Sequence, residues 1–273
     1  MKAIFYGIAS LLCALTGVVS VTPQEDEIRF GSSYNGSIYA GSKTEYVTYV
    51  TKEEEESFIN GGLPRYYDTS GRSKTCANVA GTILLGYYDK NYDELIPDFT
   101  SARVIRDRVI YYAQTSAVQD VIDELYYDMD TNTATGGTTI KDFQNGLRKY
   151  VNELGRNIAF SNVGNSNGFN YSAYLNSIRN EQPVALFVSK YSLIPIADFG
   201  ISATQDRLDK DYYTGNHVLV GYGLKEIKYY NSNGTLQKTI TLLMVATGYS
   251  REPLYYVDLS DCGYIDSYSV NIY

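Results

Sequence analysis

The chain has three cysteines and a single histidine, so few side chains could act as nucleophile and base. Cys76 opens the apolar stretch CANVAGTILLGYYD, and His217 opens the stretch HVLVGYG. A thiol at a helix N-terminus is stabilised as a thiolate by the free N–H groups and the helix dipole. An imidazole beside it accepts the thiol proton and returns it to a leaving group. The two residues therefore predict acyl transfer, with the Cys76 amide facing the developing oxyanion.

Metal chemistry is not expected from these residues. One histidine cannot build a multi-histidine site, and the cysteines show no C-x-x-C spacing. We therefore predict neither a metal site nor a cofactor. The even pair Cys76 and Cys262 leaves a second hypothesis open, in which the two form a disulfide.

The elements that position these residues follow from hydrophobic periodicity. Helices are predicted from Cys76 onward, over 116–129, from about 139 to 155 and over 171–180. Thr139 with Asp142 three residues later is typical of a helix start, and Thr75 or Ser73 is the expected cap of the first helix. Beyond residue 184 the pattern predicts strands, with Asn233-Gly234 in a hairpin loop. Helices followed by an antiparallel sheet predict an α+β domain.

The N-terminal region divides into two segments. Residues 1–20 have one lysine, an apolar run and small residues, a pattern that predicts a secretory signal peptide. Cleavage of this peptide would remove Cys13 from the mature protein. Residues 21–62 are polar and contain the acid run at 53–56, which is typical of a solvated face or flexible lead-in. Within them, SIYAGSKTEYVTYVT alternates enough for one or two strands. We interpret 21–62 as an N-terminal segment or pro-segment and 63–273 as the main domain.

Bulk charge excludes one class of partner. The net charge is −8, the isoelectric point is near 4.8, and basic residues do not cluster, so nucleic acid is not an expected partner. The apolar run near the N-terminus is too short and too interrupted for a stable membrane anchor. We expect a secreted, extracellular protein.

Two segments resemble a known family. The stretch LPRYYDTSGRSKTCANVAGTILLGYYDKNYDELIP and the strand that His217 opens resemble papain-like cysteine peptidases, most closely the bacterial C39-like branch. The papain type places its histidine about 130–150 residues after the cysteine, and here the separation is 141. The resemblance covers residues 63–273. It implies a papain-like fold, with an N-terminal helical part packed on a C-terminal antiparallel sheet, and a peptide or protein substrate.

The resemblance also implies further site residues. Family members orient the imidazole with a polar residue on a later strand, and Asp258 is the best match, with Asp261 as the alternative. The family's oxyanion-hole glutamine is missing before Cys76, so Asn78 or Ser70 is the candidate substitute. The family's tryptophans are missing too, and Tyr222 and Tyr255 are expected to take over their packing.

Three functions remain open at this point. The first is a cysteine peptidase with the triad Cys76, His217 and Asp258. The second is a secreted binding or adhesion module on the same fold, without turnover, held by a Cys76–Cys262 disulfide and favoured by the 29 tyrosines. The third is a peptidoglycan amidase that uses the same residues.

Overall fold

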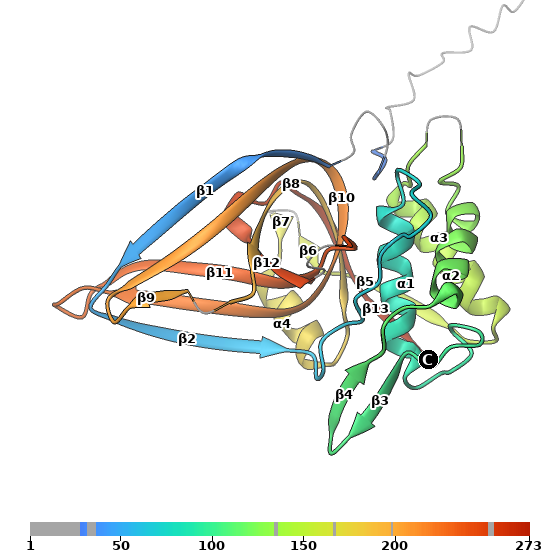
Figure 1. Cartoon of the computed structure of the whole chain (residues 1–273), viewed down its shortest axis with the longest axis horizontal. Helices are drawn as coiled ribbons and strands as arrows, with labels where there is room; N and C mark the ends of the chain where they lie inside the picture. The colour runs from blue at the N-terminus through green and yellow to red at the C-terminus, as the bar shows by residue number, and fades with distance from the viewer. Residues whose placement is uncertain (1–27, 32–36, 134–135, 166–167, 198, 251–253) are drawn as a thin grey trace, which may run out of the picture.

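The computed structural model describes residues 28–31, 37–133, 136–165, 168–197, 199–250 and 254–273 (Figure 1). The predicted signal peptide and Cys13 lie outside these residues. No helix in the described ranges is long and apolar enough to span a membrane.

The helices confirm the periodicity of the sequence. They are α1 (Cys76–Asp89), α2 (Ser116–Asp128), α3 (Ile140–Glu153) and α4 (Tyr171–Arg179). The Thr139 hydroxyl caps α3 by accepting a 3.0 Å hydrogen bond from the amide of Asp142, as the sequence predicts. In α1 every residue after Cys76 is buried, because α2, α3 and the sheet surround it.

Antiparallel strands make up most of the regular secondary structure of the described residues. They are β1 (Ile38–Thr48), β2 (Thr51–Phe58), β3 (Ala102–Ile105), β4 (Arg108–Tyr111), β5 (Ile158–Asn162), β6 (Gly164–Asn165), β7 (Gly168–Phe169), β8 (Val184–Pro195), β9 (Gly200–Ser202), β10 (Gln205–Tyr230), β11 (Leu236–Ala246), β12 (Leu254–Asp258) and β13 (Tyr264–Ile272). A short 3-10 helix, η1 (Leu259–Asp261), follows β12. Asn233-Gly234 lies in the hairpin between β10 and β11, which confirms that prediction.

One strand, β10, organises the main sheet. It is 26 residues long; its first half pairs with β1, β8 and β9, and its second half pairs with β2 and β11. The sheet order is β1-β10-β11-β12-β8-β13-β5. Because β12 joins β11 to β8 and β10 pairs with both, these four strands close into a ring (Figure 1).

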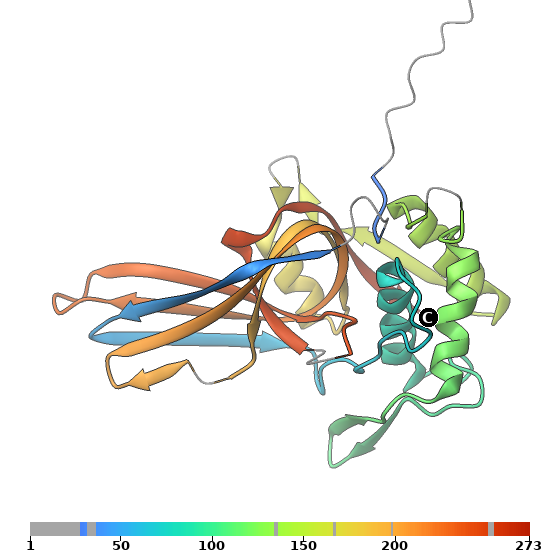
Figure 2. The same cartoon turned by 45° about the horizontal axis from the view of Figure 1, so that its top comes forward.

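The predicted papain-like fold class is wrong. The chain is mainly one large antiparallel sheet, with α1, α2 and α3 gathered at one end of it (Figures 1 and 2). The difference arises from two segments that the pattern left without a firm assignment. Residues 38–58 add β1 and β2, and residues 190–215 extend β8 and begin β10. These additions widen the excess of strand residues over helical ones.

The segment 21–62 is part of the same body where it is described. The acid run lies on β2, and Lys225 on β10 pairs with Glu54 at 2.7 Å and Glu56 at 2.8 Å. Phe30 is fully buried, forms a bridge with Thr138 and lies 4.9 Å from the ring of Phe187. A cut after residue 62 would therefore remove two strands and a core side chain.

Candidate active site

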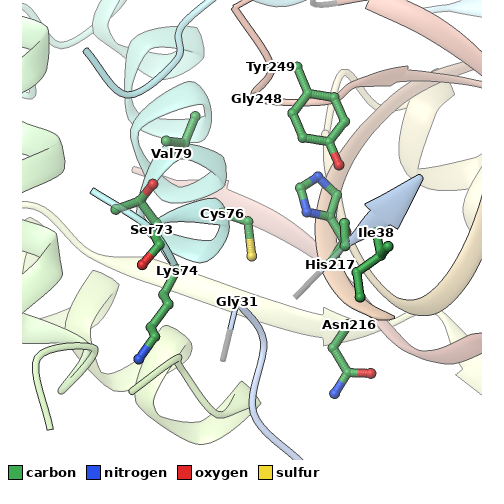
Figure 3. A pocket seen from close by; sticks show the side chains of 12 residues that line it. Gly31, Ile38, Ser73, Lys74, Cys76, Val79, Asn216, His217, Gly248 and Tyr249 are labelled. Carbon is green, nitrogen blue, oxygen red and sulfur yellow. The ribbon is translucent and has the colours of Figure 1, made fainter. Parts of the chain in front are cut away.

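Cys76 and His217 line one pocket between the start of α1 and strand β10 (Figure 3). Its volume is about 420 Å³. The thiol and the imidazole face each other across it (Figure 3). The pocket is lined by Gly31, Ser37, Ile38, Ser73, Lys74, Thr75, Cys76, Val79, Asn216, His217, Gly248 and Tyr249. The structure thus brings together two residues that are 141 positions apart.

A tight turn sets the position of Cys76. Lys74 has a φ of +76°, which a residue with a side chain seldom adopts, and α1 begins two residues later. Gly31 packs on this turn so closely that a Cβ there would lie 2.7 Å from the Lys74 carbonyl oxygen. Of the two expected caps, Thr75 is the N-cap residue, but its side chain makes no capping bond and bonds to Asp68 instead. The first amides of α1 are therefore not covered by a cap at Thr75.

A β-bulge sets the position of His217. The register between β10 and β8 shifts between Thr214 and His217, and Gly215 at the shift has a φ of +96°. Bulges re-aim side chains and are frequent beside active sites. Here the bulge presents Asn216 and His217 to the pocket, and the Asn216 amide donates to the Arg29 carbonyl at 2.9 Å. This bond joins the N-terminal segment that contributes Gly31 to the pocket to strand β10.

A backbone carbonyl orients the imidazole. The Nε2–H group of His217 donates to the carbonyl oxygen of Thr247 at 2.9 Å, because a carbonyl can only accept. Figure 3 shows the other ring nitrogen, Nδ1, on the side that faces the Cys76 thiol. In the neutral imidazole this nitrogen is the acceptor. The ring therefore presents its acceptor nitrogen on the side of Cys76 (Figure 3).

Tyrosine rings enclose the imidazole. Tyr249 and Tyr191 lie nearly parallel to it, with ring centroids at 5.0 Å and 5.4 Å, and Tyr213 stacks on Tyr191. The hydroxyls of Tyr191 and Tyr249 hydrogen-bond to each other, and Tyr191 also donates to Ser37. The predicted packing partner Tyr222 lies instead beside Gly62. The tyrosines that stack on the imidazole are thus Tyr191 and Tyr249.

Burial keeps both reactive groups uncharged. It raises the pKa of the Cys76 thiol to about 11, against the lowering effect of the amides of Val218, Ala77 and Cys76. It lowers the pKa of His217 to about 4, against the raising effect of the Thr247 carbonyl. Near neutral pH the pair is therefore a thiol and a neutral imidazole.

Asp258 does not reach this site, so its predicted role as orienter is wrong. Its Oδ2 accepts a 2.6 Å hydrogen bond from the Lys210 ammonium, and its Oδ1 accepts from the amide and hydroxyl of Ser260. The alternative, Asp261, also accepts from Lys210, at 2.9 Å. Burial favours a raised pKa for Asp258, but Lys210 and Ser260 hold that pKa below its ordinary value. Both carboxylates are held by the lysine.

Asn78 is not an oxyanion donor either. It is fully buried, and its amide donates to the Leu125 carbonyl and the Thr131 hydroxyl, each at 3.0 Å. Two helical residues turn a side chain by about 200°, so Asn78 points away from Cys76 and toward α2. Ser70, the other candidate, donates its hydroxyl to Asp68 at 2.6 Å.

The disulfide hypothesis is not supported by the structure, in which Cys76 and Cys262 are both free thiols. Cys76 lines the pocket, whereas Cys262 follows η1 and senses the charges of Lys190, Asp258 and Asp261. Burial raises the pKa of the Cys262 thiol to about 12. Cys262 is therefore a partly buried thiol that stays protonated near neutral pH.

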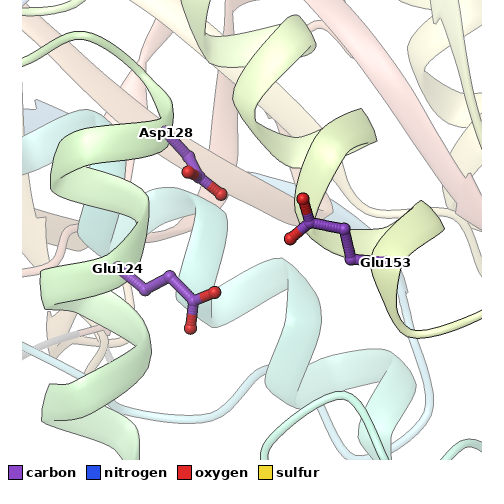
Figure 4. A group of neighbouring side chains, drawn as sticks. All are labelled: Glu124, Asp128 and Glu153. Atoms are coloured by element: carbon purple, nitrogen blue, oxygen red, sulfur yellow. The ribbon is translucent and has the colours of Figure 1, made fainter.

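One acidic group lies apart from the pocket, on α2 and α3. The carboxylates of Glu124, Asp128 and Glu153 lie within 4.8 Å of one another (Figure 4). Lys149 pairs with Asp128 and offsets part of this charge. Glu124 and Glu153 are exposed to solvent, so the group needs no ion to be stable.

Comparison with known proteins adds no relative. No family model matches the chain, and neither curated proteins nor solved structures gave a match. The resemblance of the Cys76 and His217 segments to papain-like peptidases stays a prediction.

The sequence-based prediction missed three parts of this site. They are the Thr247 carbonyl, the stacked Tyr249 and the Asn216 amide. A backbone acceptor leaves no signal in residue types, so Thr247 could not be found. Gly248-Tyr249 does carry a signal, because a glycine two residues after a buried strand marks a turn.

Proposed function

We propose that the chain is a thiol-dependent hydrolase that cleaves peptide bonds, with Cys76 as nucleophile and His217 as general base and acid. The observation that carries the proposal is their convergence on one pocket, with the Nε2–H of His217 held by a carbonyl and its Nδ1 toward the thiol. A thiol at a helix start with an oriented imidazole beside it is the arrangement that acyl transfer needs.

The reaction begins from the uncharged pair. As the substrate carbonyl enters, Nδ1 of His217 takes the thiol proton and the Cys76 sulfur attacks the carbonyl carbon. The tetrahedral intermediate collapses when the imidazolium returns this proton to the leaving amine. Water then enters, gives a proton to His217 and attacks the thioester carbonyl. The C–S bond breaks to release the carboxylic acid, and the imidazolium returns the proton to the Cys76 sulfur, which restores the thiol and the neutral imidazole.

The Thr247 carbonyl takes the role that a carboxylate has in a triad. It fixes the tautomer and the ring orientation, and it stabilises the imidazolium through a hydrogen bond to a charged donor. A carbonyl dipole stabilises a cation less than a full negative charge does. We therefore expect a slower enzyme than one with an aspartate at this position.

The oxyanion would be held at the start of α1. The Cys76 amide is the first donor, and Ser73 is the candidate for the second. Ser73 lines the pocket on the same side as Cys76 (Figure 3) and is three residues from it. A Ser73→Ala variant should then lower kcat more than it changes KM.

The test is hydrolysis of a fluorogenic peptide library by the wild type, Cys76→Ala and the matched control Cys262→Ala. Cleavage that is lost in Cys76→Ala and kept in Cys262→Ala supports the proposal. Equal cleavage by the wild type and Cys76→Ala contradicts it. A panel of cell-wall muropeptides, run alongside, separates a peptidase from a peptidoglycan amidase.

A further inference from the structure

The pocket that holds Cys76 has one charged side. Among its described lining residues Lys74 alone carries a formal charge near neutral pH, because His217 is uncharged there and no carboxylate lines the pocket. The Lys74 side chain is half-buried and runs away from the Cys76 thiol (Figure 3). Within the described ranges no carboxylate pairs with its ammonium. The pocket therefore contains a cation that the chain itself does not neutralise with an ion pair.

Two glycines fix the path of this lysine. Gly31 packs on its backbone, and a Cβ at Gly136 would lie only 2.5 Å from its Nζ and 2.8 Å from its Cδ. The side chain therefore lies flat against Gly136, where only the missing Cβ leaves room for it. Gly136 and Gly137 both have a positive φ, so they form a turn that a larger residue would strain. The ammonium is thus held at one position.

A second cation reaches the same turn. The Arg29 guanidinium is half-buried and donates to the Gly137 carbonyl oxygen at 3.2 Å. Arg29 and Lys74 therefore contact adjacent residues, and Arg29 too pairs with no carboxylate in the described part of the chain. Two half-buried cations repel each other, and the repulsion is relieved when an anion binds between them. A cleft with one sign of charge also concentrates ligands of the opposite sign.

We propose that this side of the pocket binds a carboxylate of the substrate, with Lys74 as the direct contact and Arg29 as a supporting charge. The inference rests on the proposed function, because Cys76 in the same pocket would attack the bound peptide. Adjacent Cα atoms are about 3.8 Å apart and an extended peptide advances about 3.4 Å per residue. A lysine two positions from the nucleophile therefore reaches a substrate residue close to the scissile bond. The carboxylate is that of an acidic side chain or of a free C-terminus.

The experiment compares matched peptides built on the best sequence of the fluorogenic library. Each pair has Glu or Gln at one position near the scissile bond, and each peptide is made with a free and an amidated C-terminus. The variants are Lys74→Met, Lys74→Glu and Arg29→Gln, and the control is Lys141→Met, an exposed lysine on α3. The readout is the acid preference, the ratio of kcat/KM for an acidic peptide to that for its neutral partner. A ratio within one variant cancels any general loss of activity from a change in the turn before Cys76.

The wild type should show an acid preference of about tenfold, because a hydrogen bond between charged groups is among the strong ones. Lys74→Met should lower this ratio to about one, and Lys74→Glu should invert it in favour of Lys-containing peptides. Arg29→Gln should lower it less, and Lys141→Met should keep it. The pair that shows the preference, Glu against Gln or acid against amide, identifies the source of the carboxylate. Equal cleavage of all pairs by the wild type, or a preference that survives Lys74→Met, would overturn the inference.

Binding separates this inference from the proposed function. Cys76→Ala cannot form the thioester but keeps Lys74 and Arg29, so fluorescence anisotropy of the labelled peptides measures the carboxylate site without turnover. Acidic peptides should bind Cys76→Ala about tenfold more tightly than neutral ones, and Cys76→Ala/Lys74→Met should not distinguish them. Equal binding would overturn the inference, whatever the cleavage assay gives. Cleavage that is lost in Cys76→Ala but shows no acid preference would reject the carboxylate site alone.

Discussion

Two of the buried ionisable residues on strand β10, Lys210 and His217, lie seven positions apart, and their surroundings differ. Lys210 lies 2.6 Å from Asp258, 2.9 Å from Asp261 and 3.2 Å from Glu45. These carboxylates hold its pKa above the ordinary value, although burial alone would lower it. His217 faces tyrosine rings, a carbonyl and a thiol, and burial lowers its pKa to about 4.

The difference shows how one strand can carry a residue that stabilises the fold and a residue suited to proton exchange. A buried group with charged partners stays charged and is held in place. A buried group without them stays neutral and keeps its capacity to exchange a proton. Asp258 was predicted beside His217 and is found beside Lys210. It therefore belongs to the charged cluster that holds Lys210 in place.

The largest expected effect is on catalysis. His217→Ala should lower kcat/KM for the best peptide by about 10³-fold, because general acid–base catalysis typically contributes 10²–10⁴-fold. The fold should persist, since the residue is uncharged. The measurement is steady-state hydrolysis, with a thermal melt of each variant. A loss of less than tenfold would contradict the role of His217 as base.

The next largest effect is on the stability of the fold, through the charged cluster around Lys210. Lys210→Met should lower the free energy of unfolding by about 3 kcal/mol, because it leaves the buried Asp258 and the two partly buried carboxylates beside it without their cation. Urea unfolding at pH 7 measures it, and Lys43→Met, an exposed position on β1, is the matched control. An equal, small change in both variants would show that the Lys210 group is not a structural centre.

The pH dependence of stability separates the two groups further. The folded state holds the pKa of His217 at about 4, below the ordinary value of 6.5, so the unfolded chain binds the proton first. This contribution is complete above pH 6.5 and is lost as the pH falls toward 4. It amounts to about 3 kcal/mol. Urea unfolding between pH 4 and 7 should show a shallower slope in His217→Gln than in the wild type. Parallel curves would contradict the neutral state of His217.

The smallest effect concerns the tyrosines. Tyr249→Phe keeps the ring on the imidazole and removes the hydroxyl bond to Tyr191. One hydrogen bond contributes about 1 kcal/mol, so kcat should fall by about threefold to tenfold. Tyr249→Ala also removes the stacked ring and should cost more. Steady-state kinetics of both variants checks this order, and the reverse order would contradict a packing role for the ring.

Local pattern predicted the helices and most later strands well. The apolar periodicity of α1 and α3 can be read from a short stretch of sequence, because it repeats with every helical turn. The bond between Thr139 and Asp142 likewise joins residues that are close in the sequence. The start of β10 was not recognised. There Asp206 and Lys210 alternate with exposed polar residues and are themselves buried, so the stretch has no apolar alternation.

The site was predicted in part for the same reason. Residue type alone identified Cys76 and His217, because thiols and imidazoles are rare in this chain. The position of the Asp258 carboxylate depends on its bond to Lys210, which is 48 positions away. Lys210 lies in the part of β10 that the sequence pattern did not predict. The orienting group is a backbone carbonyl at Thr247, which every residue has. Only the three-dimensional arrangement selects it.

The most direct test of the site compares His217 with Asp258 through the reactivity of Cys76. A peptide-like epoxide inhibitor of thiol peptidases is incubated with the wild type, His217→Ala and Asp258→Asn, and the labelled residue is read by peptide mass spectrometry. The account predicts labelling of Cys76 in the wild type and in folded Asp258→Asn, and none in His217→Ala. Labelling that survives His217→Ala, or that is lost in a folded Asp258→Asn, would contradict it.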